Sequence, residues 1–241
     1  MDDRIKKMID ESNNVVFFGG AGVSTESDIP DFRSETGLYN AVQQYGESPE
    51  RMISRSYFMS NTEKFFDYYK NNMVYVDAKP NAAHIALANL EKEGKLKAVV
   101  TQNIDGLHQA AGSKTVYELH GSIHRNYCMD CNEFYDLDYI MDEANCKNGV
   151  PICKKCGGIV KPDVVLYEEA LDELQITGAV KAISEADMLI IGGTSLAVYP
   201  AASFIHYFKG NHLVIINRDE TPQDGMAELV VHDKIGKVLG D

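Results

Sequence analysis

The sequence predicts an α/β protein in which a parallel sheet carries helices on both faces and a smaller second domain is formed by insertions. Two observations predict the sheet. Short runs of β-branched residues alternate with helical patterns. The runs 15–18 and 189–191 are also continuously apolar, as strands buried on both faces are. A third observation, five cysteines confined to a segment that breaks the alternation, predicts the smaller domain.

Six segments are expected to form the strands. They are residues 14–20, 96–103, 114–121, 186–193, 211–217 and 227–233. Helices are expected over 81–94, where Pro80 and Gly94 mark the ends, over about 171–186, over 201–208, and in the polar N-terminal segment 1–14. Strands that alternate with helices in this order predict a Rossmann-like sheet.

Two segments interrupt this alternation. Residues 31–76 lack strand signals and are rich in Tyr, Phe, Met and Asn, and residues 122–160 hold all five cysteines. We therefore expect a discontinuous Rossmann-like domain made of residues 1–30, 77–121 and 161–241. Residues 31–76 would supply a loop and the helical part of the small domain, and residues 122–160 its metal-binding module.

Composition and charge exclude several classes of function. The chain of 241 residues has a formal net charge of −13, whereas a general nucleic-acid binder would be basic, so no direct nucleic-acid partner is expected. The acidic surface either steers a basic partner, such as a lysine-rich segment, or only keeps the protein soluble. The N-terminal segment lacks the apolar core of a signal peptide, and glycines and Pro200 interrupt the apolar stretch 188–205. No membrane partner is expected, and the predicted location is the cytoplasm, where thiols stay reduced.

The cysteines predict a structural zinc site. Cys128 and Cys131 form one closely spaced pair, and Cys153 and Cys156 form another. Two such pairs at this separation are typical of a site with four thiolate ligands, which leaves no open position for a substrate. Disulfides or free thiols are the alternatives, and the reducing compartment argues against disulfides. Cys146 is expected to be a bystander thiol because the ligand set is complete without it.

Polar residues follow several of the predicted strands, at the edge where open parallel sheets bind ligands. Gln102, Asn103 and Asp105 could hold a carboxamide or a ribose, although Asn103 or Asp105 could equally cap a helix. His120 ends another strand and is either a general base or a structural histidine. Small polar residues suited to phosphate, ribose and adenine contacts follow two further strands; they are Gly193, Thr194, Ser195 and Asn217. The remaining histidines of this region, His84 and His108, are expected to be structural.

The first strand leads into a turn that departs from the usual dinucleotide fingerprint, because Thr25 stands where a third glycine is usual. In chain order the motifs are "GAGVSTESDIPDFR", "TQNIDGLH", "ELHG", the paired cysteines, "KPDVVLY", "GTSLAVYP" and "IIN". Together they resemble the sirtuin family, the NAD-dependent protein lysine deacylases, from about Asn14 to Ile235. The chain is similar to a compact bacterial form with little outside the catalytic core.

The resemblance implies roles for individual residues. The residues that would bind NAD are Gly20, Ala21, Gly22, Thr25, Asp31, Phe32, Arg33, Gln102, Asn103, Ile104, Asp105, His120, Gly193, Thr194, Ser195, Asn217 and Ile235. The residues that would flank an acetyl-lysine peptide, bound as an added strand, are Val164, Val165, Tyr167, Leu196, Val198 and Tyr199. His120 would be the general base and would form the catalytic set with Asn103 and Asp105. The segment after the glycine turn would be a mobile cofactor-binding loop, in which Phe32 keeps water from the reacting sugar carbon.

The resemblance also implies the reaction. The acetyl group of acetyl-lysine would pass to ADP-ribose, with release of nicotinamide and free lysine, and the zinc would take no part in the chemistry. The chain departs from the family pattern at Lys161, where arginine is usual, and at Tyr167-Glu168-Glu169, where Phe-Gly-Glu is usual. Val42 stands three residues after Tyr39, where an arginine would favour acidic acyl groups, so neutral acyl groups are expected.

Two other functions remain open at this point. One is an ADP-ribosyltransferase that uses the same NAD site with a protein side chain as acceptor. The other is a non-catalytic module that binds acyl-lysine or a nucleotide. A module that only binds has no need of a general base, so His120, Asn103 and Asp105 argue against the second.

Overall fold

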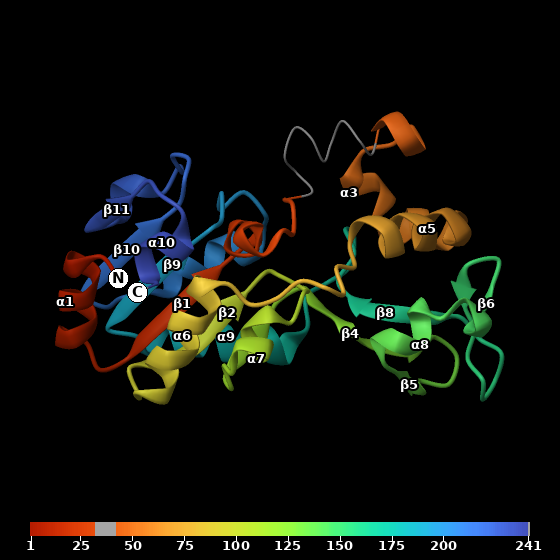
Figure 1. Ribbon diagram of the computed structural model, residues 1–241, viewed down its shortest axis with the longest axis horizontal. Helices are drawn as coiled ribbons and strands as arrows, with labels where there is room; N and C mark the ends of the chain where they lie inside the picture. Colours follow the sequence, from red (N-terminus) through yellow and green to blue (C-terminus); the bar gives the residue numbers. More distant parts are fainter. Residues whose placement is uncertain (32–41, 241) are drawn as a thin grey trace.

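The computed structural model describes residues 1–31 and 42–240, which form two lobes (Figure 1). The larger lobe is built on a six-stranded sheet with the order β11-β10-β9-β1-β2-β3, and every neighbouring pair is parallel. Its strands are β1 (Val15–Gly19), β2 (Leu96–Thr101), β3 (Val116–Glu118), β9 (Met188–Gly192), β10 (His212–Ile216) and β11 (Leu229–Val231). The predicted strands and the parallel sheet are confirmed.

Helices cover both faces of this sheet. On one face lie α1 (Asp3–Glu11), α6 (Ala82–Lys92) and α10 (Ile235–Leu239), and on the other lie α9 (Glu173–Glu185) and the 3-10 helix η4 (Ala201–Tyr207). Successive side chains of a strand point to opposite faces, so Phe17 packs with the first group of helices and Phe18 with the second. This two-sided burial is the reason that β1 and β9 are apolar at every position.

The smaller lobe combines the two inserted segments (Figure 1). Helices α3 (Pro49–Met52), α4 (Arg55–Ser60) and α5 (Thr62–Asn72) come from the first insertion. The second supplies a sheet of the order β5-β4-β8, made of β5 (Phe134–Tyr135), β4 (Gly121–Cys128) and β8 (Val160–Val164), with α8 (Leu137–Met141) and the hairpin of β6 (Cys146–Lys147) and β7 (Val150–Pro151). Aromatic side chains of α4 and α5, including Phe58, Phe65 and Tyr69, pack with Ile123 and Val160 in one core. The smaller domain expected from the insertions is thus present.

Two details differ from the sequence prediction. Residues 201–207 form a 3-10 helix rather than an α-helix, and there the Ser203 hydroxyl donates to the Pro200 carbonyl at 2.7 Å. Residues 160–164 form β8, which pairs antiparallel with β4, and neither strand was among the six predicted. A pairing between such distant segments leaves no local pattern. The domain boundaries themselves stay a prediction.

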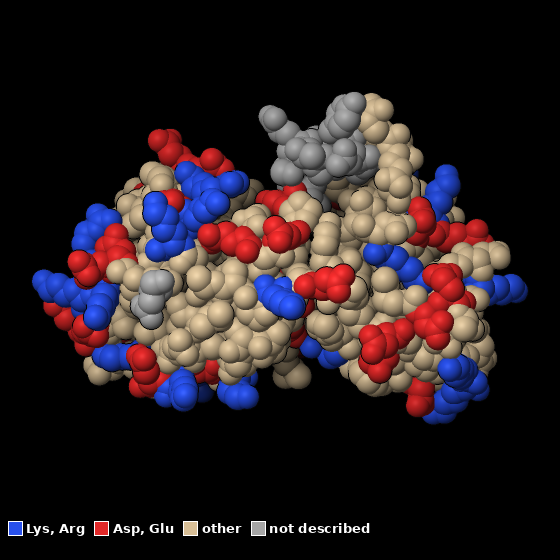
Figure 2. All heavy atoms as spheres, in the orientation of Figure 1, with Lys and Arg blue, Asp and Glu red and all other residues tan. Residues whose placement is uncertain are grey.

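The surface mixes charges of both signs. On the face drawn in Figure 2, acidic and basic side chains are interspersed over both lobes. Within the described residues, the structure contains no helix that is long and apolar enough to cross a membrane.

Two buried histidines of the larger lobe, His84 in α6 and His108, pack against each other. His84 and His108 are 0% and 1% exposed, and their ring centroids lie 4.7 Å apart. Asn81 N–H donates to His84 Nδ1 at 3.2 Å, which completes the cap of α6, while both ring nitrogens of His108 lack a partner among the described residues. Burial lowers the pKa of His84 to about 4 and that of His108 to about 3, the latter also because of His84. Both imidazoles are therefore neutral in the folded protein, and their structural role is as expected.

We expect this pair to make the protein sensitive to acid. An unfolded histidine has a pKa of about 6.5, so below that pH the unfolded chain binds protons that the folded chain excludes. The contribution of this pair to the free energy of unfolding should be constant above about pH 7 and should fall below it, by at most about 2.7 kcal/mol per pH unit for two such groups. Urea denaturation between about pH 8 and pH 5 measures this slope. His108→Leu removes one titrating group and should flatten the slope, and identical slopes for variant and wild type would contradict this account.

Candidate active site and cysteine centre

The carboxyl ends of β1, β9 and β2 converge through close backbone packing. Gly22 N–H donates to the Gly193 carbonyl at 2.8 Å, and Gln102 N–H donates to the Gly19 carbonyl at 3.0 Å. A Cβ on Gly22 would lie 2.7 Å from the backbone of Gly193, whose own φ is +59°. Glycine is required at both positions because no side chain fits between the two strand ends. The predicted glycine turn after β1 thus packs directly against Gly193, at the carboxyl end of β9.

Thr25 begins the second of two short 3-10 helices, η1 (Ala21–Val23) and η2 (Thr25–Ser27), that follow the glycine turn. Its hydroxyl donates to the Gly22 carbonyl at 2.9 Å. A threonine therefore closes the turn with a side-chain hydrogen bond in place of the third glycine of the usual fingerprint.

Residues of four strands meet at this edge of the sheet. The Gln102 amide donates to the Thr194 hydroxyl at 3.2 Å, and Gly193 N–H donates to the Ile216 carbonyl, next to Asn217. A Cβ on Gly192 would touch Ile235, which lies over the end of β9. The predicted adenosine-side residues therefore surround one region, with Thr194 and Ile235 buried, Asn217 half-buried and Ser195 exposed.

A buried serine links the two polar residues that follow β2. The Ser24 hydroxyl donates to Asp105 Oδ2 at 2.7 Å and accepts from Asn103 Nδ2 at 3.0 Å. Asp105 Oδ1 also accepts from Leu107 N–H at 2.9 Å, an Asx-type turn at the start of the helix Leu107–Ala111, whose N-cap is Gly106 rather than Asp105. Burial raises the pKa of Asp105, while the hydrogen bonds from Leu107 and Ser24 act in the opposite direction. Sequence reasoning missed Ser24, although it stands inside the glycine-rich motif.

Ser24→Ala should lower kcat/KM because it removes both hydrogen bonds that orient Asn103 and Asp105. One to two such bonds at a buried site correspond to a loss of roughly tenfold to a hundredfold. Steady-state kinetics of the deacetylation that the sequence resemblance implies measure the change in kcat/KM. Ser12→Ala is a matched control, because Ser12 is an equally buried serine that precedes β1, at the opposite end of the strand from Ser24, and its hydroxyl donates to the Met8 carbonyl. Equal kcat/KM values for the two variants would remove Ser24 from the site.

His120 lies between the large sheet and the smaller lobe. Its Nδ1 contacts the Gln102 carbonyl at 2.9 Å. A carbonyl can only accept, so Nδ1 carries the proton in the neutral ring and Nε2 is the basic nitrogen. Val165 N–H donates to the His120 carbonyl at 3.0 Å, which places the residue after β8 directly beside the histidine. This arrangement suits a general base held in one tautomer.

One cleft of about 220 Å³ brings together His120 and the polar residues that follow β2, whereas the adenosine-side residues Thr194, Asn217 and Ile235 are not among its walls. From the larger lobe it is lined by Ala21, Ser24, Gln102, Asn103, Ile104, Asp105 and His120, and from the smaller lobe by Ile53, Met73 and Tyr75 among others. Five of the six residues expected to flank a peptide line it as well; they are Val164, Val165, Tyr167, Val198 and Tyr199. Leu196, by contrast, is buried and is not among its walls.

Part of the predicted site lies in the segment that the structure does not describe. Asp31 is half-buried and is the last described residue before it. Phe32, Arg33 and Tyr39 lie outside the described residues, so their expected roles stay predictions. Val42 is described and is 45% exposed.

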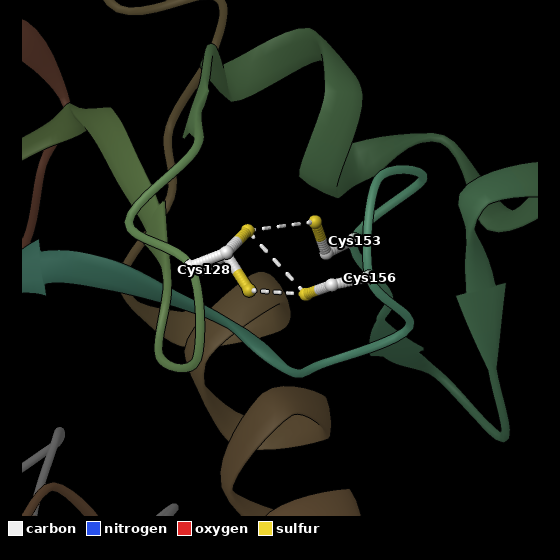
Figure 3. Close-up of side chains that lie close together, drawn as sticks. Cys128, Cys153 and Cys156 are labelled. Atoms are coloured by element: carbon white, nitrogen blue, oxygen red, sulfur yellow. Dashed lines mark hydrogen bonds between the residues drawn. The ribbon is translucent and has the colours of Figure 1, made fainter.

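The four predicted zinc ligands form one cluster. Their sulfur atoms all lie within 4.8 Å of one another, and Figure 3 shows the sulfurs of Cys128, Cys153 and Cys156 turned toward each other. The Cys128–Cys156 and Cys131–Cys156 sulfur pairs are 3.4 Å apart, and the Cys131–Cys153 pair is 3.7 Å apart. A tetrahedral zinc with Zn–S bonds of about 2.3 Å places its sulfurs about 3.8 Å apart, whereas a disulfide needs about 2.05 Å. The donor set therefore fits a structural zinc.

Neighbouring groups orient these thiolates. The Tyr135 hydroxyl contacts Cys153 Sγ at 3.1 Å, and Asp130 N–H donates to Cys128 Sγ at 3.4 Å. Cys146 lies outside the cluster and contacts Lys70 Nζ at 3.3 Å, in agreement with the expectation that it is not a ligand.

The fold and the site define a class of protein: an α/β protein with polar residues gathered at the strand ends of a parallel sheet and a second lobe, with a four-cysteine cluster that fits zinc, across the cleft. Residues 20–200 match the Sir2 family. An NAD-dependent protein deacetylase of Clostridium acetobutylicum is 62% identical over 98% of this chain and 96% of that protein. One of Clostridium tetani is 62% identical over 100% and 97%.

Solved structures agree with these relatives. A Sir2 structure with a p53 peptide and NAD+ superimposes with a TM-score of 0.86 at 36% identity, over 98% of this chain and 94% of that one. Sir2 bound to an acetylated peptide gives 0.85 at 35%, with the same coverage. The chain belongs to the Sir2 family, the sirtuins.

Proposed function

We propose that the protein is an NAD-dependent protein lysine deacetylase that transfers the acetyl group of acetyl-lysine to ADP-ribose and releases nicotinamide and free lysine. The observation that carries this proposal is the position of His120. The His120 carbonyl accepts a hydrogen bond from Val165 N–H, in the segment 164–167 that would flank the peptide and is called the peptide wall below. The His120 ring forms a hydrogen bond with the carbonyl of Gln102, which follows β2 on the side that would bind the nucleotide. One histidine thus borders both halves of a single cleft, as a base that acts between two substrates must.

Different strand ends would bind different parts of the co-substrate NAD. Gly20, Gly22 and Gly193 allow the chain to approach the pyrophosphate closely, and the edge near Ile235 and Asn217 would hold the adenosine. Asn103 and Asp105, linked by Ser24, would hold the nicotinamide carboxamide, because amide and carboxylate groups together supply a donor and an acceptor.

The peptide would bind as a strand between the segments 164–167 and 198–199. Backbone pairing of this kind reads the acetyl-lysine more than its neighbours. NAD would supply the sugar carbon that receives the acetyl oxygen as its bond to nicotinamide breaks, and one water would be consumed in the release of free lysine. His120 Nε2 would then take a proton from a ribose hydroxyl, while Asn103 and Asp105 keep the nicotinamide end oriented and the walls of the cleft limit access of water.

Relatives with bound peptides support the partner class. Homologous Sir2 structures contain an acetylated peptide, or a p53 peptide with NAD+. For this chain, proteins or peptides that carry acetyl-lysine are the proposed substrates. The cytoplasm remains the proposed location.

Mass spectrometry of an acetyl-lysine peptide incubated with and without NAD tests the function. We expect loss of the acetyl group only with NAD, together with nicotinamide and acetyl-ADP-ribose. An intact acetyl-peptide with ADP-ribose attached to protein would instead identify a transferase. Binding of NAD with no change in any species would identify a binding module.

A further inference from the structure

The peptide wall ends in a turn with an unusual backbone. Glu169 N–H donates to the Leu166 carbonyl at 3.0 Å, which closes the turn over residues 166–169. Glu168 is the third residue of this turn and has a φ of +77°. That value is typical of glycine in a type II turn, because a Cβ crowds the backbone there. A glutamate at this position requires stabilisation by something other than its backbone.

The Glu168 carboxylate supplies that stabilisation. It accepts from Ser56 N–H at 2.8 Å and from the Ser56 hydroxyl at 2.9 Å, both in α4 of the smaller lobe. These donors are neutral, so they fix the position of the carboxylate but leave its negative charge in place. Two bonds also leave part of the acceptor capacity of a carboxylate unused.

Neighbouring carboxylates are neutralised, in contrast to Glu168. Glu169 pairs with Lys161 at 3.2 Å and with Arg55 at 3.3 Å, and Asp163 pairs with Arg125 at 2.8 Å. Among the described residues, no Lys or Arg forms an ion pair with Glu168, which is exposed. The described lining of the cleft includes three acidic residues, Asp105, Glu168 and Glu169, and no Lys or Arg. Glu168 is therefore a fixed anion at the peptide side of the cleft that has no ion pair among the described residues, although Arg55 and Lys161, both paired with Glu169, line a second hollow with it.

This anion lies within reach of a bound peptide. Val165 is bonded to His120, and Glu168 follows Val165 by three residues, a span of at most about 10 Å. An extended peptide advances by about 3.3 Å per residue, so the same distance covers about three residues on either side of an acetyl-lysine at His120.

From this geometry we infer that Glu168 sets a substrate preference: acetyl-lysine segments with a lysine or arginine within about three residues of the acetyl-lysine. The inference rests on the proposed deacetylase function. A solvent-exposed ion pair contributes about 0.2–1 kcal/mol, which predicts a KM lower by a factor of about 1.4 to 5 for a basic than for a neutral flank. Added salt should remove the difference, because exposed charges are screened over about 3 Å at 1 M.

Four sets of acetyl-lysine peptides test the inference. Each set varies one position, two or three residues before or after the acetyl-lysine, and its three peptides carry Lys, Ala or Glu there. We expect the wild-type KM to rise in the order Lys, Ala, Glu for at least one position. Glu168→Gln keeps an acceptor for Ser56 but removes the charge, so its KM should be the same for the three peptides. Glu168→Gly is a second variant that the backbone tolerates, and it should also lose the preference. Glu93→Gln removes an exposed charge at the end of α6 and should keep it.

The outcomes separate the two proposals. Wild-type turnover of all the peptides with equal KM values would overturn the substrate preference and leave the deacetylase function intact. A preference that survives in both Glu168 variants would also overturn it. No NAD-dependent turnover of any peptide would overturn the deacetylase function, and the preference with it.

Discussion

His120→Ala should reduce kcat by roughly a hundredfold to ten-thousandfold and leave NAD affinity nearly unchanged. The size follows from the usual contribution of a positioned general base. The ring of His120 contacts the Gln102 carbonyl, whereas the glycine turn that would hold NAD is fixed by the Thr25 hydroxyl and by the Gly193 carbonyl. Single-turnover kinetics with an acetyl-lysine peptide measure the chemical step, and calorimetry measures NAD binding.

His206→Ala is the matched control for this variant. His206 is an exposed histidine of η4, and its removal should leave kcat unchanged. Near-wild-type kcat in His120→Ala would sink the assignment of the base. A parallel loss of NAD affinity would instead give His120 a role in binding.

Cys153→Ser should abolish metal binding and destabilise the smaller lobe. Cys128 and Cys153 belong to the same buried core as Val160, Val164 and Leu166, so loss of the zinc should loosen the peptide wall of the cleft. Structural zinc supplies about 10–16 kcal/mol in small zinc-dependent domains, so we expect a large fall in Tm and loss of deacetylation. Metal analysis should find about one zinc per chain in the wild type and almost none in the variant.

Cys146→Ser provides a control for removal of a thiol. Cys146 lies in the same lobe but outside the ligand cluster, so its variant should keep the metal and the activity. Chelation of the wild-type protein should reproduce the effect of Cys153→Ser. Retention of the metal and of activity in Cys153→Ser would refute the four-cysteine site.

The sequence by itself determined the larger lobe and the metal centre. Strands such as β1 and β9 are buried on both faces, so their sequences are continuously apolar. A local hydrophobic pattern of this kind can be recognised from the sequence alone. The cysteine pairs were predictable for a similar reason, because each pair comes from one tight turn and needs only local spacing.

Only the tertiary structure decided how distant segments meet. The pairing of β4 with β8 brings Val165 to His120, and the bonds of Ser24 to Asn103 and Asp105 cross from one strand end to another. The hydrogen bonds from Ser56 to the Glu168 carboxylate join residues more than a hundred positions apart. No periodic pattern or fixed spacing in the sequence predicts these contacts. Side-chain hydrogen bonds between distant elements depend on packing geometry rather than on local propensity.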